Sequence, residues 1–353
     1  MLLKEKGKPF VFEDVPKPTP NEGEAVAKII ATGAGLTIHH TRMGRTPDIK
    51  YPLIIGHEIT AEISSVGKGV KNLKEGDAVT AYFYVTCGEC KWCRINRETL
   101  CSNFLGYVGR QIQGAYAEYI KLPARNFIKL PEKLNYKDNP AEVAVICDAI
   151  ATPYKVTRRA KIAPLENVAV IGAGGGVGIH MVMMAKRAGA RVIAVDIAGE
   201  KLEKCKEIGA DEVIDASKEN VTSSLIEMTN GDGLDVAIDF VSTSETIESA
   251  TQSLGIGGRF VTLGGAGQDF SASAREMVQK ELEIIGSRYC TKQEVIESLE
   301  LVARGDVWPL VTEKYKLEDV EKAHNRLETG SILGRAVLMI KLKKKFKKIS
   351  KNQ

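Results

Sequence analysis

The sequence predicts an α/β protein in which a doubly wound parallel sheet follows a β-rich first half. Three features support this prediction. Strand and helix patterns alternate from Asn167 onward, a string of glycines joins the first of those strands to its helix, and short β-branched runs fill the region before residue 150. Such alternation is typical of parallel strands joined by helical crossovers. A chain of 353 residues is long enough for two domains with separate cores.

The first half is expected to form short strands joined by turns. Runs of β-branched and apolar residues end at Gly, Asp and Lys-Glu-Gly turn signals, and Gly67, Gly69 and Gly76 are expected turn positions. The expected strands cover residues 23–35, 57–67 and 76–85.

The second half is expected to alternate buried strands with amphipathic helices. Strands are expected over residues 167–172, 191–197, 211–216, 234–242, 258–265 and 282–289. Helices are expected over 178–190, 201–210, around Leu225, over 246–254 and over 294–305. Beyond the last helix the pattern becomes mixed again, and we expect that segment to rejoin the first domain.

Composition and charge exclude several classes of function. Hydrophobic residues make up 44% of the chain and charged residues 27%, which is typical of a globular protein. Runs long enough for a transmembrane span are missing, and the charged N-terminus does not resemble a secretory signal, so we expect a cytoplasmic protein. The net charge of +4 is concentrated in the last residues, where seven lysines follow one another closely. We expect a solvated, disordered tail there rather than a binding site for nucleic acid or membrane.

The glycine string predicts a site for a dinucleotide. Glycines are needed where a strand turns tightly into a helix and the backbone approaches a pyrophosphate, which the helix N-terminus attracts. The spacing of Gly172, Gly175 and Gly178 is GxxGxxG, one residue looser than the usual fingerprint. The residues expected to bind cofactor in this turn are Gly172, Gly174, Gly175, Gly176, Val177 and Gly178.

Asp196 is expected to select the cofactor. It ends the next predicted strand, where a carboxylate accepts hydrogen bonds from the adenosine ribose and repels a 2′-phosphate. Lys201 lies close by, and no arginine follows the strand directly. We therefore expect NAD(H) rather than NADP(H); the alternative is an aspartate that only caps the helix from Gly199.

Four of the seven cysteines predict a structural zinc site. Cys87, Cys90, Cys93 and Cys101 have the spacing C-x2-C-x2-C-x7-C. Four thiolates from one short loop form the closed tetrahedral site that structural zinc occupies. Disulfides are disfavoured by the expected compartment and the close spacing, whereas an iron–sulfur cluster is possible on ligand type alone.

The cysteine loop, the glycine turn and the motif GHE at Gly56–Glu58 together resemble the zinc-dependent alcohol dehydrogenases of the medium-chain dehydrogenase/reductase superfamily. The motifs EGDAV and GAYAEYIKLPARNFIKLP add to the resemblance, which runs from about Lys8 to Ile340. It implies a GroES-like catalytic domain, a Rossmann cofactor domain and an active site between them. The implied boundaries are 1–151 for the catalytic domain with its zinc lobe at 87–101, 152–289 for the Rossmann domain, 290–341 for a return to the catalytic domain, and 342–353 for the tail.

The resemblance also implies a catalytic zinc, but both of its expected cysteine ligands are replaced. Gly35 stands at the first position, and an alignment on Thr152 and Tyr154 places Asp148 at the second, with Cys147 one residue before it. A slip of one residue would bring in Cys147. The remaining candidate ligands are His57, Glu58, Asp148 and His39. An N/O set of this kind can hold zinc.

The same comparison assigns a proton relay to Thr37 beside the substrate and to His40 at its outer end. Thr37, His40, His57, Glu58 and Asp148 are therefore the expected catalytic residues.

Three functions remain open from the sequence. The first is an NAD-dependent dehydrogenase that interconverts an alcohol and its aldehyde or ketone, with an altered catalytic zinc. The second is a zinc-free reductase of the same fold that acts on enone, quinone or activated acyl substrates. The third, a non-enzymatic binding protein, is disfavoured by the intact glycine turn. The segment CDAIATPY also resembles dehydrogenases of alicyclic hydroxyacyl-CoA compounds. A small-molecule substrate and a homodimer or homotetramer are expected.

Overall fold

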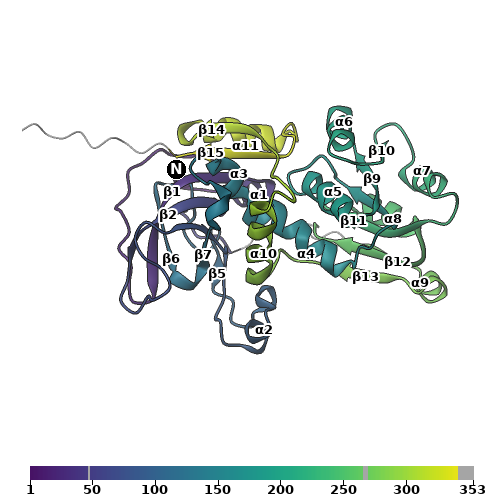
Figure 1. The fold of residues 1–353 in the computed structure, drawn as a ribbon. Helices are drawn as coiled ribbons and strands as arrows, with labels where there is room; N and C mark the ends of the chain where they lie inside the picture. Colours follow the sequence, from purple (N-terminus) through teal and green to yellow (C-terminus); the bar gives the residue numbers. More distant parts are fainter. Residues whose placement is uncertain (47, 265–268, 341–353) are drawn as a thin grey trace, which may run out of the picture.

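The computed structural model describes residues 1–46, 48–264 and 269–340, and the expected tail at 342–353 lies outside them. Two halves lie side by side, each built around one large sheet, with helices α4 (Ala151–Arg159) and α10 (Lys292–Ala303) between them (Figure 1). Among the described residues, no helix is both long and apolar enough to cross a membrane.

The second half contains a six-stranded parallel sheet. In chain order its strands take the positions 3-2-1-4-5-6, so the direction of winding reverses between β8 and β11. Ligands of such sheets bind outside the carboxyl ends of the strands at this reversal. From one edge to the other the strands are β10 (Glu212–Asp215), β9 (Arg191–Asp196), β8 (Asn167–Ile171), β11 (Leu234–Asp239), β12 (Leu254–Thr262) and β13 (Glu283–Gly286).

Helices cover both faces of this sheet, as the alternation along its central strand requires. Val168 and Val170 pack into one core cluster, while Ala169 and Ile171 pack into another on the opposite face. Successive side chains of a strand point to opposite faces, so both faces are buried. The helices of this half are α5 (Gly178–Arg187), α6 (Gly199–Glu207), α7 (Val221–Met228), α8 (Ser244–Gln252) and α9 (Ala274–Lys280).

Two helices differ from the sequence prediction. The helix expected over 246–254 begins at Ser244, because Thr243 and Thr246 form a reciprocal capping box at its start. It ends at Gln252, and β12 then begins at Leu254. Helix α9 was not expected from the sequence; it begins at Ala274, and the side chain of the N-cap residue Ser273 accepts a hydrogen bond from the Glu276 N–H.

The first half contains a seven-stranded sheet that includes the end of the described chain. Strands β14 and β15 pair with each other in parallel, and β15 pairs with β1 antiparallel. The main path runs through β14 (Val311–Lys316), β15 (Arg335–Met339), β1 (Glu24–Ala34), β2 (Ile59–Val66), β3 (Ala78–Ala81) and β7 (Phe127–Lys129), and β6 (Tyr119–Pro123) also pairs with β1. Helices α1 (Leu36–Arg42) and α11 (Val320–Glu328) contact each other beside this sheet.

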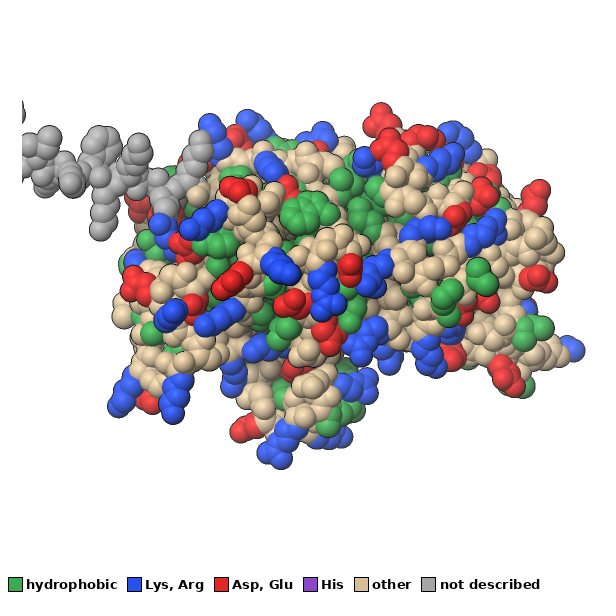
Figure 2. Space-filling model, viewed as in Figure 1, with side chains coloured by type: hydrophobic (Ala, Val, Ile, Leu, Met, Phe, Trp, Pro, Cys, Tyr) green, Lys and Arg blue, Asp and Glu red, His purple; other side chains and the backbone are tan. Residues whose placement is uncertain are grey.

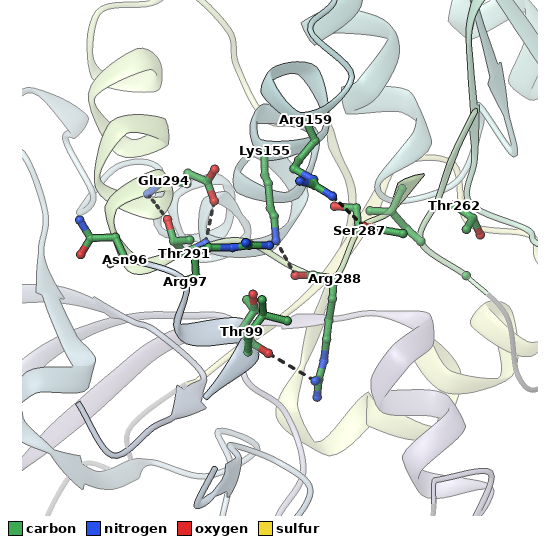
Figure 3. Close-up of a pocket in the computed structure, with 14 residues that line it drawn as sticks. Asn96, Arg97, Thr99, Lys155, Arg159, Thr262, Ser287, Arg288, Thr291 and Glu294 are labelled. Carbon is green, nitrogen blue, oxygen red and sulfur yellow. Dashed lines mark hydrogen bonds between the residues drawn. The ribbon is translucent and has the colours of Figure 1, made fainter. Parts of the chain in front are cut away.

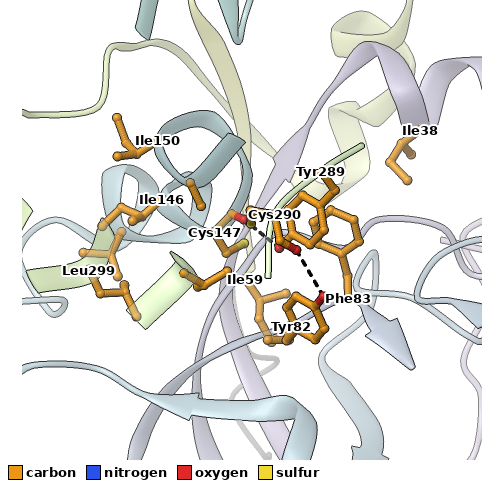
Figure 4. Packing of buried hydrophobic residues seen from close by; sticks show 14 of the residues in the cluster. Ile38, Ile59, Tyr82, Phe83, Ile146, Cys147, Ile150, Tyr289, Cys290 and Leu299 are labelled. Carbon is orange, nitrogen blue, oxygen red and sulfur yellow. Dashed lines mark hydrogen bonds between the residues drawn. The ribbon is translucent and has the colours of Figure 1, made fainter. Parts of the chain in front are cut away.

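A helix with a π-helical centre joins the two halves. It consists of α3 (Pro140–Val145), the π segment η4 (Ile146–Ile150) and α4. Figure 4 shows η4 packed in the core among residues that precede and follow it by many positions, such as Ile59 and Leu299. The Tyr289 hydroxyl donates a hydrogen bond to the Cys147 carbonyl (2.7 Å), and the Tyr82 hydroxyl donates one to the Cys290 carbonyl (3.1 Å). These bonds fix the segment that carries Asp148, and such π segments often occur at functional sites.

The zinc-lobe residues form a separate projection. Strands β4 (Tyr84–Val85) and β5 (Gly106–Tyr107) pair at its base, and the short helix α2 (Lys91–Arg94) lies at its tip (Figure 1).

Candidate active site

The glycine turn joins β8 to α5, and its geometry explains the unusual spacing. Gly172 has φ +75°, a left-handed conformation that side chains disfavour. Its carbonyl accepts a hydrogen bond from the Gly175 N–H (3.1 Å). A Cβ at Gly178 would lie 2.1 Å from the same carbonyl oxygen. The first and last glycines are therefore required by the turn itself.

Two further glycines allow cationic side chains to pack over the turn. A Cβ at Gly174 would lie 2.3 Å from the Lys201 Cβ, and one at Gly176 would lie 2.9 Å from the Arg335 Cδ. Lys201 comes from α6, and Arg335 is the first residue of β15 in the other half of the molecule. The turn at the N-terminus of α5 is thus flanked by two basic residues, an arrangement suited to a pyrophosphate.

Asp196 ends β9 beside this turn. Its Oδ2 accepts a hydrogen bond from the Gly174 N–H (2.9 Å), and its Oδ1 accepts from the N–H groups of Ile197 (2.9 Å) and Ala198 (3.2 Å). These bonds fix the carboxylate at the mouth of the turn. Each carboxylate oxygen can accept more than one hydrogen bond, so acceptor capacity remains for ribose hydroxyls.

His57, Glu58 and Asp148 lie together in the interior. His57 and Glu58 directly precede β2, and Asp148 lies in η4. The His57 Nε2 is 3.6 Å from the Glu58 Oε1 and 4.0 Å from the Asp148 Oδ2. Thr152, one turn after Asp148, donates a hydrogen bond to its Oδ1 (2.9 Å). The structure therefore brings together three of the four candidate ligands.

Arg335 supplies the positive charge at this cluster. Its guanidinium pairs with the Glu58 carboxylate, and its Nη2 is 3.6 Å from the Asp148 Oδ2. Only 4% of Arg335 is exposed, and burial lowers its pKa to about 10, so it stays charged at neutral pH. Burial also lowers the pKa of His57, although Asp148 opposes this effect. A neutral His57 keeps a lone pair that can bind a metal.

The residues present fit a divalent cation with nitrogen and oxygen ligands. Both His57 Nε2 and Glu58 Oε2 are buried without a hydrogen-bond partner, which is unusual for polar atoms. A Cβ at Gly35 would lie 3.3 Å from the Arg335 Nη2 and 3.5 Å from the Glu58 Oε1. A side chain at position 35 would therefore point at this cluster, and Arg335 competes there for the same carboxylates.

The four cysteines of the lobe fit a tetrahedral zinc ion. Four of the Sγ–Sγ distances are 3.9 Å for Cys87–Cys93, 3.6 Å for Cys90–Cys93, 3.9 Å for Cys90–Cys101 and 3.5 Å for Cys87–Cys101. A tetrahedron with zinc–sulfur bonds of about 2.3 Å has edges of about 3.8 Å. All seven cysteines of the chain are described, and none is in a disulfide. Backbone N–H groups of Cys93 and Ser102 lower the pKa of Cys90 to about 6, which favours a thiolate.

Comparisons with known proteins agree with this geometry. Residues 21–132 match the alcohol dehydrogenase GroES-like domain, and residues 176–304 match the zinc-binding dehydrogenase domain. An NAD-dependent alcohol dehydrogenase of Sulfurisphaera tokodaii is 34% identical over 96% of this chain and 99% of its own. An acryloyl-coenzyme A reductase of Metallosphaera sedula is 31% identical over 93% and 96%. The crystal structure of an Aeropyrum pernix alcohol dehydrogenase has a TM-score of 0.88 and 32% identity, covering 96% of this chain and 98% of that one.

The chain belongs to the zinc-type alcohol dehydrogenase family. The family resemblance and the α/β fold class predicted from the sequence are confirmed. Membership makes the protein an oxidoreductase of the medium-chain type.

His39 does not join the cluster that the family resemblance led us to expect. It is buried on α1, and its Nδ1 is 3.3 Å from the Nδ1 of His324 on α11. The group of possible ligands contains His57, Glu58 and Asp148 without it. Adjacent residues of a helix point about 100° apart, so His39 and His40 cannot both face the same cleft.

Cys147 is also directed away from the cluster. It is fully buried, its thiol donates to the Ala144 carbonyl (3.5 Å), and burial raises its pKa to about 12. Its thiol therefore stays protonated, and Asp148 is the residue of this segment that faces His57.

Thr37 and His40 lie three residues apart on α1, which places them on one face of the helix. Thr37 is exposed and His40 is partly buried. Burial lowers the pKa of His40, with Arg45 and Arg110 adding to the effect. His40 is therefore neutral at pH 7 and able to accept a proton.

Two arginines of the site were missed by sequence reasoning. Arg335 lies 277 residues from Glu58, and nothing in its local sequence marks it. The positive charge of Arg110 contributes to lowering the pKa of both His57 and His40. Arg110 is a basic residue in a loop and Arg335 is a basic residue at the start of a strand, and both patterns are too common to identify a site residue.

The buried pair of His39 and His324 predicts acid sensitivity. Burial holds the pKa of His324 well below its usual value, and Arg42 and His39 lower it further. The unfolded chain binds this proton near pH 6.5, whereas the folded chain does not, so stability is lost as pH falls below about 6.5. We expect urea unfolding to show a loss of about 1.4 kcal/mol per pH unit from this residue. In His324→Gln, the unfolding free energy should depend on pH less steeply, by the contribution of about one proton. The same dependence on pH in the variant and the wild-type protein would contradict the prediction.

Proposed function

We propose that this oxidoreductase interconverts an alcohol and its aldehyde or ketone, with NAD(H) as the hydride carrier and a second, unusual metal site held by His57, Glu58 and Asp148. It would act in the cytoplasm as a homodimer or homotetramer and bind a small-molecule substrate.

One observation carries this proposal: Arg335 reaches from the glycine turn to the His57 cluster. Its Cδ lies against Gly176, while its guanidinium lies between Glu58 and Asp148. A dinucleotide bound along the turn would therefore have its reactive end near His57. The carboxylate of Asp196, at the other end of the turn, would hold the adenosine ribose.

The residues of the chain would serve the reaction in separate ways. In the oxidation direction, the bound cofactor would accept a hydride from the alcohol carbon. The hydroxyl proton would leave through side chains of the protein. Thr37 would bind the substrate hydroxyl, and His40 would take up its proton and pass it to solvent. Arg335 and Arg110 would stabilise negative charge on the oxygen. A zinc ion, when bound, supplies Lewis acidity that lowers the pKa of the alcohol.

A second candidate is a zinc-free reductase for activated acyl or enone substrates. It is favoured by Arg335, whose guanidinium lies where a side chain at Gly35 would point. In this case Arg335 would be the cation that stabilises the carbonyl oxygen. The likeness to acryloyl-coenzyme A reductases agrees with this candidate.

Metal content distinguishes the two candidates. We expect two zinc ions per chain in protein purified without chelator, one in the cysteine lobe and one at His57. Asp148→Asn should remove one of them and most of the alcohol oxidation, measured by elemental analysis and NADH formation. Its control is Asp138→Asn, a change at an exposed site whose side chain accepts a hydrogen bond from the Asn135 side chain and lies outside the proposed metal site. One zinc in the wild-type protein would favour the reductase, and two zinc ions retained in Asp148→Asn would remove Asp148 from the ligand set.

A further inference from the structure

A cavity of about 420 Å³ lies between the zinc lobe, α4 and the start of α10 (Figure 3). Its size falls within the roughly 300–1,000 Å³ typical of ligand pockets. Four cationic side chains line it, and Glu294 is the only acidic residue of the lining. The cations are Arg97 from the lobe, Lys155 and Arg159 from α4, and Arg288 after β13.

Three of these four cations are held by backbone carbonyls rather than by carboxylates. The Lys155 Nζ donates to the Arg288 carbonyl (2.9 Å), the Arg288 Nη1 to the Thr99 carbonyl (3.4 Å), and the Arg159 Nη2 to the Gly286 carbonyl (3.5 Å). Among the described residues, none of the four is within 4 Å of a carboxylate oxygen, although Arg158 next to them pairs with Glu297. Cations held only by neutral carbonyls leave a positive field that an anion can satisfy.

One wall of the cavity offers a further hydrogen-bond donor. The Ser287 Oγ is buried and has no partner in the described structure. Lys155 is 9% exposed, and burial lowers its pKa, which shows that this ammonium is desolvated. Desolvated donors around one cavity are suited to a multiply charged group such as phosphate.

The cavity is adjacent to the active site. Its lining includes Thr262–Gly264 and Gly286–Arg288, which follow the carboxyl ends of β12 and β13, the edge of the sheet that also carries the glycine turn. Lys155 and Arg159 follow Asp148 and Thr152 along one helix at spacings of three and four residues, so they share a face with the His57 cluster.

A second connection runs through Tyr107. The Arg288 guanidinium carbon is 5.4 Å from the centre of this ring, and that of Arg110 is 5.0 Å from it. In the view of Figure 2, Lys and Arg side chains gather where the lobe meets the Rossmann half. Cationic side chains therefore continue from Arg288 in the cavity, across the Tyr107 ring, to Arg110.

From this geometry we infer that the cavity binds the phosphate-bearing arm of the substrate, whose reactive end reaches the His57 cluster. A thioester of coenzyme A has this chemistry: a polyanionic nucleotide joined by a long neutral arm to an acyl group. The inference rests on the proposed function, because it concerns the substrate that the oxidoreductase acts on.

The test uses coenzyme A as the probe and zinc-loaded enzyme saturated with NADH, so that the dinucleotide site is filled. Calorimetry should show binding of coenzyme A and little binding of pantetheine, which lacks the phosphates. Arg159→Ala and Arg288→Ala should each weaken binding about tenfold or more, because each removes a charge-assisted hydrogen-bond donor. Both residues are exposed, and Arg159→Glu gives a stronger charge change at the same position.

The matched control is Arg158→Ala, which changes the neighbouring arginine outside the cavity and should leave the affinity for coenzyme A unchanged. The inference would be overturned by equal binding of pantetheine, by binding of coenzyme A to NADH-free enzyme that is lost once NADH saturates the dinucleotide site, or by inorganic phosphate binding as tightly as coenzyme A. NAD-dependent turnover of small alcohols and of a hydroxyacyl thioester of coenzyme A is measured on the same preparations. Turnover without coenzyme A binding would reject only this inference, whereas coenzyme A binding without any hydride transfer would reject the proposed function.

Discussion

Replacing Arg335 by methionine is expected to destabilise the folded protein by about 3–5 kcal/mol, because it leaves two buried carboxylates without their cation. Glu58 is 1% exposed and cannot recover its hydration, and Asp148 is mostly buried. Urea unfolding of metal-free protein measures this loss. If the His57 cluster also binds zinc, added zinc should restore part of the stability, since it neutralises the same carboxylates.

Two further variants show whether this loss comes from the buried charge. Arg335→Lys keeps the charge but lacks the planar fork that reaches both carboxylates, so an intermediate loss is expected. Arg326→Met removes an arginine that forms three hydrogen bonds with Glu313 at the surface, where ion pairs contribute little. Similar losses in Arg335→Met and Arg326→Met would contradict the role given to burial.

The second half could be predicted from the sequence because its signals are local. Val168 and Val170 alternate with Ala169 and Ile171, which marks a strand buried on both faces without any knowledge of its neighbours. The glycine turn and Asp196 were located in the same way, because each lies directly at the end of such a strand.

The reaction centre was less predictable because long-range packing decides it. Cys147 and Asp148 are adjacent, and the sequence alone left open which of them faces His57. The π segment and the hydrogen bond from Tyr289, 142 residues away, settle the rotation of this helix. Arg335 depends on long-range packing in the same way, because β15 pairs with β1 although the whole second half lies between them in the sequence.

His39 shows the limit of carrying residues over from a family. A pair of histidines in a site-forming segment suggested that both could act there. The helix that carries them turns His39 towards α11, where it meets His324 and the ring of Tyr116 is close by. Only His40 keeps a position compatible with a proton relay.

Asp196→Asn is expected to lower the preference for NAD over NADP by about 100-fold or more. The carboxylate would accept two hydrogen bonds from the adenosine ribose, and each charge-assisted bond contributes about 1.5–3 kcal/mol, or at least tenfold. An amide also lacks the negative charge that repels a 2′-phosphate. The measurement is kcat/KM for both cofactors with one alcohol.

Asp215→Asn is the matched control, because Asp215 ends β10 directly beside Asp196 in the sheet register but pairs with Lys218 instead of facing the turn. A wild-type enzyme that prefers NADP, or the same ratio in both variants, would contradict the assignment. The control also isolates the cause: both aspartates end neighbouring strands, but only Asp196 bonds the glycine turn, so a change in cofactor preference confined to Asp196→Asn would come from the cofactor bound at that turn.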